Sequence, residues 1–379
     1  MSSATLVAVS TTRTYLRASS MSIPIIALLG RQDHPTDAVE EYCRYLGRAL
    51  AAYDFRMEIR LVPWDLRGWA SSLEALRLMA ASWHGRWVLV QYTALAWSAR
   101  GFPGKFERVL YTLAKAGAHI GVVYHDVEPY SGDRLVDHAR RFVQVRTMRS
   151  ASRFADAAIF TVPVEKISWI TGSPDNAHFI PVGPNLPVVE LPAKAQQGDE
   201  TPCVAVFSIT GGEPGVAETR AIIAAVRHAA EEIGKVHLSV FGRNADSAEA
   251  SLREGLRDLP VKISVEGLLE ESQIVERLSA AYVLLFVRGP ISSRRGSAIA
   301  GIACGLPVIA FAGSETAPPI TDAGVVLVSE QKQDELNAAL LRVFSDSAYR
   351  AELAFRSRAA FAKHFSWASI AARYASILR

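Results

Sequence analysis

The most constraining feature of this sequence is the repeated alternation of short, continuous apolar runs with longer stretches of helical periodicity. From Ile23 onward the apolar runs include IPIIALL, RWVLVQY, HIGVVYH and AAIFTVP, and amphipathic stretches such as TDAVEEYCRYLGRALAAY lie between them. Strands that are apolar along their whole length are typical of a parallel sheet covered by helices on both faces. The pattern therefore predicts an α/β fold built from doubly wound sheets.

The alternation is interrupted by a polar stretch with four prolines, GPNLPVVELPAKAQQGDETP, at residues 183–202. Strand-like runs resume after it with CVAVFSI, VHLSVFG, VKISVEG and AAYVLLFV. Such an interruption between two similar patterns is typical of a linker. We predict one Rossmann-like domain at 21–185, a linker at 186–202 and a second Rossmann-like domain at 203–360. The amphipathic end, 361–379, is predicted to be a helix that packs back toward the first domain.

The first 20 residues differ from the rest of the chain. The segment MSSATLVAVSTTRTYLRASS has no acidic residue and lacks the long apolar core of a signal peptide. We expect a disordered or mis-started extension here rather than a targeting signal.

Composition excludes several classes of protein. At 379 residues, half of them apolar, the chain is long enough for two domains, and its net charge of +3 is too small to indicate a nucleic-acid partner. Its three cysteines are far apart in apolar segments, which predicts neither disulfides nor a zinc site and fits a reducing, cytoplasmic setting. No apolar run approaches the roughly 20 residues of a membrane-spanning helix, so we expect no such helix.

Two open sheets joined by a linker turn the carboxyl ends of their strands toward one shared cleft, where ligands of such sheets bind. The first candidate for that cleft is the segment FVRGPISSRRGSAIAGIACGLPVIAF, residues 286–311. Gly296 and Ser297 are predicted to begin a helix whose free N–H groups attract an anion, and Arg294 and Arg295 add two permanent charges. The segment predicts a phosphate or diphosphate site; a well-capped, solvated turn is the alternative.

A second candidate is the strand GVVYHDVEPY, which ends in His125 and Asp126. A histidine at the carboxyl end of a parallel strand can exchange hydrogen bonds with a sugar hydroxyl, and a neighbouring carboxylate can set its tautomer. A histidine that merely ends the strand is the alternative. Asp126 and Glu128 also have a D-x-E spacing, but no third metal ligand is near them in the sequence.

Two glycine-containing loops follow the first strands of the two predicted domains. Gly30, Arg31, Gln32 and Asp33 follow the first strand and would face the cleft on the acceptor side, although a plain surface loop is equally compatible with them. In SITGGEPGV, Gly211 and Gly212 do not have the G-x-G-x-x-G spacing of a dinucleotide site, but a backbone turn there could approach a diphosphate.

A basic run lies in the first predicted domain, within GDRLVDHARRFVQVRTMRSASRF. A helix that carries several arginines with apolar residues between them can lie on an anionic lipid surface. Most charge runs are simply solvated faces, so both interpretations remain open. The arginines are Arg134, Arg140, Arg141, Arg146, Arg149 and Arg153.

Nearly the whole chain after Met21 resembles a GT-B glycosyltransferase of the retaining family 4 type. The resemblance rests on the first glycine loop and on VVYHD, FIPVGPN, VEGLLEESQIVERLSAAYVLLF, GIACGLPVIAF and FSWASIAARY. Members of that family carry two glutamates eight positions apart that contact the donor sugar and the ribose. The corresponding positions here are Ser292 and Ala300, so this chain resembles a divergent branch in which an arginine pair replaces the acidic, glycine-rich loop.

The resemblance implies transfer of a sugar from a nucleoside diphosphate donor to a hydroxyl of a saccharide or lipid-linked saccharide. It implies retention of configuration, no metal, no cofactor besides the donor substrate, a role in polysaccharide or glycoconjugate assembly, and peripheral contact with an anionic membrane. His125 and Asp126 would be catalytic. Donor binding would include Ser292, Gly211, Gly212, Arg243 and Glu266 besides the Arg294–Ser297 loop. A nucleotide-sugar-binding protein without activity and a GT-B-like nucleotide-sugar epimerase are the alternatives.

Overall fold

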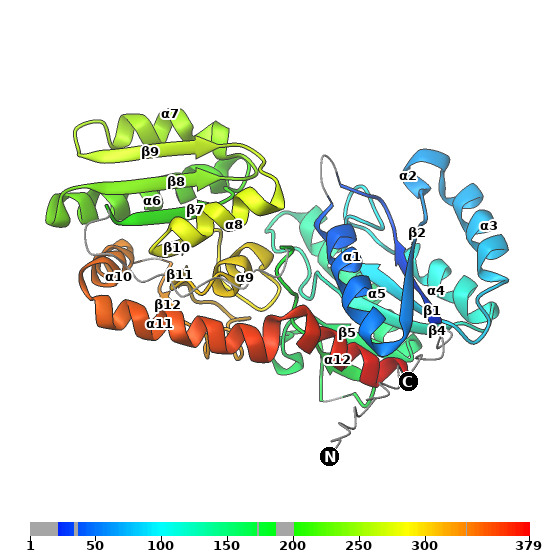
Figure 1. Ribbon diagram of the computed structural model, residues 1–379. Coiled ribbons are helices and arrows are strands. Elements are labelled where there is room, and N and C mark those ends of the chain that lie inside the picture. Colours follow the sequence, from blue (N-terminus) through cyan, green and yellow to red (C-terminus); the bar gives the residue numbers. More distant parts are fainter. Residues whose placement is uncertain (1–21, 34–36, 173, 187–200, 331) are drawn as a thin grey trace, which may run out of the picture.

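The computed structural model describes residues 22–33, 37–172, 174–186, 201–330 and 332–379. The chain forms two lobes, each built on a six-stranded parallel sheet with helices on both faces (Figure 1). This confirms the predicted α/β class with two doubly wound sheets. The predicted extension at 1–20 and most of the predicted linker, 187–200, lie outside the described residues.

The N-terminal lobe has the strand order β2-β1-β3-β4-β5-β6, all parallel. The chain reverses its direction of travel across the sheet between β1 and β3, which makes that gap the switch point where ligands of such sheets bind. The strands are β1 Ile23–Leu29, β2 Phe55–Leu61, β3 Trp87–Tyr92, β4 His119–Tyr124, β5 Ala157–Phe160 and β6 Ala177–Phe179. The helices are α1 Ala38–Leu50, α2 Trp64–Arg67, α3 Trp69–Ala80, α4 Phe106–Lys115 and α5 Leu135–Phe154.

The C-terminal lobe has the strand order β12-β11-β10-β7-β8-β9, again parallel, with its switch point between β10 and β7. Its strands are β7 Cys203–Phe207, β8 Val236–Phe241, β9 Val261–Glu266, β10 Val283–Phe286, β11 Val308–Phe311 and β12 Val325–Val328. Its helices are α6 Glu213–Ile233, α7 Ala245–Gly255, α8 Glu271–Ala280, α9 Gly296–Ala303, α10 Gln333–Ser345 and α11 Ser347–Ala360, and α12 Trp367–Leu378 follows.

Burial explains why the apolar runs become strands. From Ile25 to Leu29 in β1 every side chain is buried, and β10 is buried along its whole length. Burial of a large aliphatic side chain contributes roughly 1.5–3 kcal/mol, so a strand buried on both faces is stable only under two layers of helices. One of the three apolar clusters is continuous between the lobes, since it joins β1 and α1 to α9 and α12.

The chain returns from the C-terminal lobe to the N-terminal lobe before its last helix. α11 lies on the C-terminal lobe, a π-helical turn at Phe361–Phe365 follows, and α12 packs against α1 of the N-terminal lobe (Figure 1). The Tyr42 and Tyr374 hydroxyls are hydrogen bonded at 2.9 Å, and the Trp367 ring stacks on Tyr45 with centroids 5.5 Å apart.

The two crossings of the chain meet at one side chain. Trp367 Nε1 donates to the Pro184 carbonyl at 2.9 Å, just before the segment that leads into the second lobe. A Cβ atom at Gly183 would lie 2.8 Å from the Trp367 ring, so this position has room only for glycine. None of the described helices is long and apolar enough to cross a membrane.

Candidate functional site

The carboxyl ends of the two sheets are joined by contacts between lobes. Ser293, in the loop before α9, accepts a hydrogen bond from Val182 N through its carbonyl at 3.0 Å, and its hydroxyl donates to the Thr161 carbonyl at 2.7 Å. Arg243, which follows β8, pairs with Asp33 of the loop after β1 at 3.1 Å. These contacts bring the SSRRGS loop to the edge of the N-terminal sheet.

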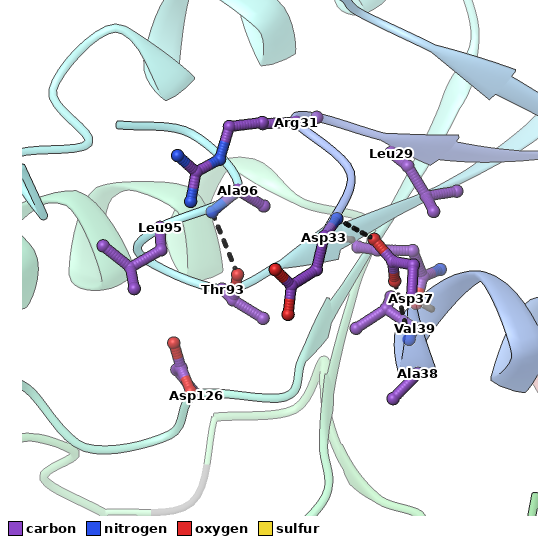
Figure 2. Close-up of a pocket in the computed structure, with 12 residues that line it drawn as sticks. Leu29, Arg31, Asp33, Asp37, Ala38, Val39, Thr93, Leu95, Ala96 and Asp126 are labelled. Atoms are coloured by element: carbon purple, nitrogen blue, oxygen red, sulfur yellow. Dashed lines mark hydrogen bonds between the residues drawn. The ribbon is translucent and has the colours of Figure 1, made fainter. Parts of the chain in front are cut away.

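A pocket of about 310 Å³ lies at the switch point of the N-terminal sheet. Figure 2 shows polar side chains of the loops after β1, β3 and β4 around one space, with Arg31 on one side and the Asp33 carboxylate directed into it. Hydrogen-bonding groups that surround a small cavity are suited to a saccharide. The lining residues are Leu29, Gly30, Arg31, Asp33, Asp37, Ala38, Val39, Gln91, Thr93, Leu95, Ala96 and Asp126.

Gly30 is required by the way the pocket wall is built. Arg31 N donates to the Ala96 carbonyl at 2.8 Å, which draws the loop after β1 against the loop after β3. A Cβ atom at residue 30 would lie 2.2 Å from the Ala96 oxygen, well inside contact distance. The close approach of the two backbones therefore excludes any larger residue.

The rest of this loop is tied to the start of α1. Asp37 caps α1 by accepting from Val39 N and Glu40 N, and its second oxygen accepts from Asp33 N at 2.9 Å. The Gln32 amide donates to Glu40, so Gln32 does not line the pocket. Of the predicted acceptor-side residues, Gly30, Arg31 and Asp33 lie at the pocket and Gln32 lies beside it.

Asp126 lines the pocket at the end of β4. Its Oδ2 accepts from Ala94 N at 3.0 Å, and no other hydrogen bond to this carboxylate comes from the described residues. Burial raises the pKa of Asp126 above its ordinary value, although the Ala94 N–H and the charges of Arg294 and Arg295 act in the opposite direction. A carboxylate with a raised pKa beside an anion site is suited to accept a proton from a hydroxyl group.

His125, which precedes Asp126 at the end of β4, is not among the residues that line the pocket. Its Nε2–H donates to Gln91 Oε1 at 2.9 Å, and its ring makes an edge contact with Tyr42, with centroids 5.1 Å apart. Burial lowers the pKa of His125 to about 4, and the opposing effect of Asp37 is smaller. The imidazole is therefore neutral at pH 7 and links the end of β4 to α1.

For a metal ion at Asp126 and Glu128, the described residues offer no third ligand. Glu128 accepts from Ser168 N at 2.6 Å and from its hydroxyl at 2.5 Å, away from Asp126. Among the described ranges no group of three or more His, Cys, Asp or Glu side chains could hold a metal ion.

The two adjacent arginines have different surroundings. Arg294 binds Glu315 through two parallel hydrogen bonds of 2.7 and 2.9 Å. Burial alone would lower the pKa of Arg294, but Glu315 outweighs it and holds that pKa above its ordinary value. Burial raises the pKa of Glu315, and Arg294 more than reverses the effect. The pair is thus charged and mutually neutralised.

Arg295 has no such partner. In the part of the chain that the structure describes it makes no ion pair, and its buried Nε atom has no hydrogen-bond acceptor. Burial lowers the pKa of Arg295 to about 10, and the charges of Arg294 and Arg288 act in the same direction. Arg288, which follows β10, was not singled out from the sequence; it is a lone arginine in FVRGP, and only its place after a strand could have indicated it.

α9 begins at Gly296, with no side-chain cap and no acidic residue in its first turn. A Cβ atom at Gly301 would lie 2.5 Å from the Leu284 side chain, so this glycine lets α9 pack closely on β10. The uncapped N–H groups at Gly296 and Ser297 lie at the same edge of the sheet as the arginines.

The remaining predicted donor residues lie around this edge in different states. Gly211 and Gly212 are exposed at the start of α6, and Gly212 has a φ of +72°. Ser292 is completely buried. Glu266 is bound by Arg277 through hydrogen bonds of 2.6 and 2.9 Å, so it is already paired.

A second depression, of about 540 Å³, lies on α5. It is formed by one face of the helix, on which Phe142 precedes and Phe154 follows the three arginines Arg146, Arg149 and Arg153. Phe142 is 68% exposed, and among the described residues none of these three arginines has a carboxylate partner.

The two facing parallel sheets define the GT-B fold, and solved structures of this fold match nearly the whole chain. HepE from Anabaena, in complex with UDP and glucose, covers 94% of this chain and 99% of its own at 16% identity and a TM-score of 0.64. Sucrose-phosphate synthase from Thermosynechococcus elongatus covers 94% of this chain and 98% of its own at 20% identity and a TM-score of 0.67.

A Listeria monocytogenes protein assigned as a UDP-N-acetylglucosamine 2-epimerase also matches, over 93% of this chain and 95% of its own, at 12% identity and a TM-score of 0.59. No family model and no curated protein matches the sequence. The likeness therefore establishes the fold, and the side chains of the cleft carry the functional argument.

Proposed function

We propose that this protein is a metal-independent glycosyltransferase that moves a sugar from a nucleoside diphosphate to a hydroxyl of a saccharide or lipid-linked saccharide. The observation that carries the proposal is the position of Asp126, in a polar pocket of one lobe, within electrostatic reach of Arg294 and Arg295 of the other. A carboxylate that can take a proton and, in Arg295, a cation without an ion-pair partner among the described residues then lie on the two sides of the boundary between the lobes.

The proposed chemistry follows from charge. As the glycosidic bond breaks, negative charge develops on the departing diphosphate. Fixed arginines and the free N–H groups at the start of α9 stabilise that charge without a metal, because they are already oriented when the reaction begins. The hydroxyl of the acceptor, held in the pocket of the N-terminal lobe, then forms its bond to the sugar carbon on the face from which the diphosphate leaves, as retention of configuration requires, and its proton passes to the Asp126 carboxylate.

The finer assignments remain part of the proposal. We expect a hexosyl group to be transferred with retention of configuration, in polysaccharide or glycoconjugate assembly, as the family resemblance implies. Ser292 and Ala300 stand where that family has glutamates, so contacts to the donor sugar would come from other residues. Asp126 lines the pocket and neutral His125 is hydrogen bonded to Gln91, which also lines it, so both are proposed to serve catalysis.

A lipid-linked acceptor would also explain α5. Each arginine beside an anionic membrane contributes about 1 kcal/mol, weakened by salt, and exposed phenylalanines add an apolar contribution. The three arginines of the α5 face lack carboxylate partners among the described residues, and the exposed side chains of Phe142 and Phe154 lie on either side of them along the helix. We propose that this face docks the protein, from the cytoplasmic side, on an anionic membrane that carries the acceptor.

The decisive experiment incubates the protein with a panel of nucleoside diphosphate sugars, with and without saccharide acceptors, and measures release of the nucleoside diphosphate. Slow hydrolysis with one donor, accelerated by an acceptor, is the expected result. Conversion of the donor sugar without any acceptor would instead assign an epimerase, in line with the Listeria structure. Binding of a donor without turnover would assign a nucleotide-sugar-binding protein.

A further inference from the structure

Two half-buried arginines lie beside the switch point of the C-terminal sheet, and neither has an acceptor for its buried Nε–H among the described residues. Arg288 follows β10, the strand that neighbours β7 across the switch point, and Arg295 lies at the end of the same loop, immediately before α9. The Nε atoms of both are buried and make no hydrogen bond with the described residues. A buried donor without an acceptor costs free energy, so such groups need an explanation.

The neighbouring arginines show what is unusual about these two. Arg294 is neutralised by Glu315 and Arg243 pairs with Asp33. Arg288 and Arg295 form no ion pair within the described part of the chain. The carboxylate of Glu218 does attract Arg288, but it accepts a hydrogen bond from Thr210 N at 2.8 Å and makes none with the arginine.

The two charges also repel one another. Burial lowers the pKa of Arg288, and the charge of Arg243 adds to that effect. Burial likewise lowers the pKa of Arg295; Arg294 lowers it further, Glu315 acts in the opposite direction, and Arg288 adds a smaller lowering effect. Repulsion between cations that are held close together in a partly buried place is reduced when an anion binds between them, and the reduction is greatest for an anion with two charges.

The backbone at two helix starts on this edge is not covered by other atoms. A Cβ atom built at Gly296 or at Gly212 would meet no atom within 4 Å, so the backbone at the start of α9 and of α6 is open to a ligand. The N–H groups at both helix starts would then supplement the arginines.

We infer that Arg288 and Arg295 together bind the diphosphate of the donor, whereas Arg294 is a positioning residue that Glu315 locks in place. The inference rests on the proposed function and assigns its anion site to a pair of residues, one of which the sequence had not indicated. Such a site would bind a diphosphate more tightly than a monophosphate, because each of the two guanidinium groups can bind one phosphate group.

The test is calorimetry of UDP, UMP and inorganic pyrophosphate with the wild-type protein and with Arg288→Gln and Arg295→Gln. Arg253→Gln on α7, where Arg253 makes an exposed pair with Glu249, serves as the matched control. Each cleft variant is expected to weaken UDP binding by about tenfold or more and to narrow the preference for UDP over UMP. The control is expected to bind like the wild type.

The outcomes separate this inference from the proposed function. UDP binding by the wild type with unchanged affinity in both variants would overturn the inference and leave the function standing. Pyrophosphate binding that depends on both arginines, with no nucleotide bound and no donor sugar turned over, would support the anion pair and remove the proposed function. No binding of any of the three probes to the wild type would overturn both.

Thermal unfolding keeps the inference testable if a glutamine variant folds poorly. Removal of an arginine that stabilises the fold lowers the stability of the protein. A partly buried arginine that is retained for a ligand can be replaced by methionine without loss of stability. Arg288→Met and Arg295→Met are expected to keep or raise the Tm of the unliganded protein and to lose the rise in Tm that UDP causes. A lowered Tm with an intact response to UDP would contradict the inference.

Discussion

The carboxylate of Asp33 and the guanidinium of Arg243, 210 residues apart in the chain, lie 3.1 Å apart across the cleft between the lobes. Asp33 lines the acceptor-side pocket, and Arg243 follows β8 at the carboxyl edge of the other sheet. The pair therefore couples the two halves of the proposed site. Its two side chains are 67% and 37% exposed, so the coupling is weak and is screened by salt.

Asp33→Asn is expected to change the free energy of unfolding by no more than about 1 kcal/mol, because exposed ion pairs contribute little. The KM for the acceptor is expected to rise several-fold, since the loop that lines the pocket loses its anchor on the other lobe. Steady-state kinetics beside urea unfolding checks this. A large loss of stability with unchanged KM would assign the pair to the fold alone.

Glu315→Ala is expected to be far more damaging than loss of the Asp33 pair. It leaves Arg294 mostly buried without its counter-ion, which typically costs about 3 kcal/mol or more. Urea denaturation measures the loss. The double variant Arg294→Met, Glu315→Leu removes both charges and should recover much of the stability; if it is no more stable than Glu315→Ala, the pair does not act as described.

The buried imidazole of His125 predicts a pH dependence of stability. Its pKa is about 4 in the folded protein, below the ordinary value near 6.5, so the unfolded chain binds a proton that the folded chain refuses. The contribution of neutral His125 to stability is complete above about pH 6.5 and is lost progressively as the pH falls toward 4. Between pH 7 and pH 4 the free energy of unfolding should therefore fall less steeply for His125→Gln than for the wild type, as urea unfolding at each pH would show.

The same variant tests the catalytic role that we propose for His125. Loss of its contacts with Gln91 and Tyr42 is expected to lower kcat at least tenfold while the protein still folds at pH 7. Parallel curves in the pH series together with wild-type kcat would show that the side chain is neither buried neutral nor needed for turnover.

Gly30→Ala is expected to distort the acceptor pocket, because its methyl group would collide with the Ala96 carbonyl. Overpacking against a fixed backbone costs about 1–3 kcal/mol, and transfer to the acceptor should fall more than hydrolysis of the donor. Gly104→Ala is the control, since a Cβ atom at that position meets nothing within 4 Å. Equal losses in the two variants would mean that the effect is not specific to the pocket.

The basic face of α5 is tested by sedimentation with vesicles that contain anionic lipid. Wild-type protein should bind at low salt and be released at high salt, and Arg146→Glu with Arg149→Glu should abolish binding. Arg56→Glu with Arg60→Glu, at two exposed arginines of β2, changes the net charge by the same amount and is the control. Absence of binding at low salt, or equal loss in the control, would remove the membrane from the proposal.

The sheets were predictable because their strands are buried on both faces and so appear as continuous apolar runs. The start of α9 at Gly296 could be predicted for a similar reason, since a polar loop meets a run of small residues there. Strand order could not be predicted: β10 lies beside β7 only because the chain crosses over, and that crossing places Arg288 at the switch point.

The sequence also did not predict which side chains would be paired with partners far away in the chain. Nothing in SSRRGS shows that Arg294 is neutralised by Glu315, 21 residues further on, while Arg295 is left without a partner among the described residues. In the same way, Gln32 belongs to a loop that faces the cleft but is turned toward Glu40. Local patterns locate a loop, and packing of remote segments decides which of its side chains are available.

Trp367 fixes how the two lobes can move. Trp367 belongs to the segment that returns to the N-terminal lobe; its Nε1 donates to the Pro184 carbonyl, just before the other crossing, and its ring stacks on Tyr45 of α1. This attachment is buried, whereas the Asp33–Arg243 pair is exposed and weak, so the lobes can swing about Trp367 more readily than they can slide past one another. We therefore expect a hinge motion about Trp367 that moves the facing edges of the two lobes apart and together. If the proposed transfer takes place, this motion lets the nucleoside diphosphate leave at the open side while the two lobes stay in register.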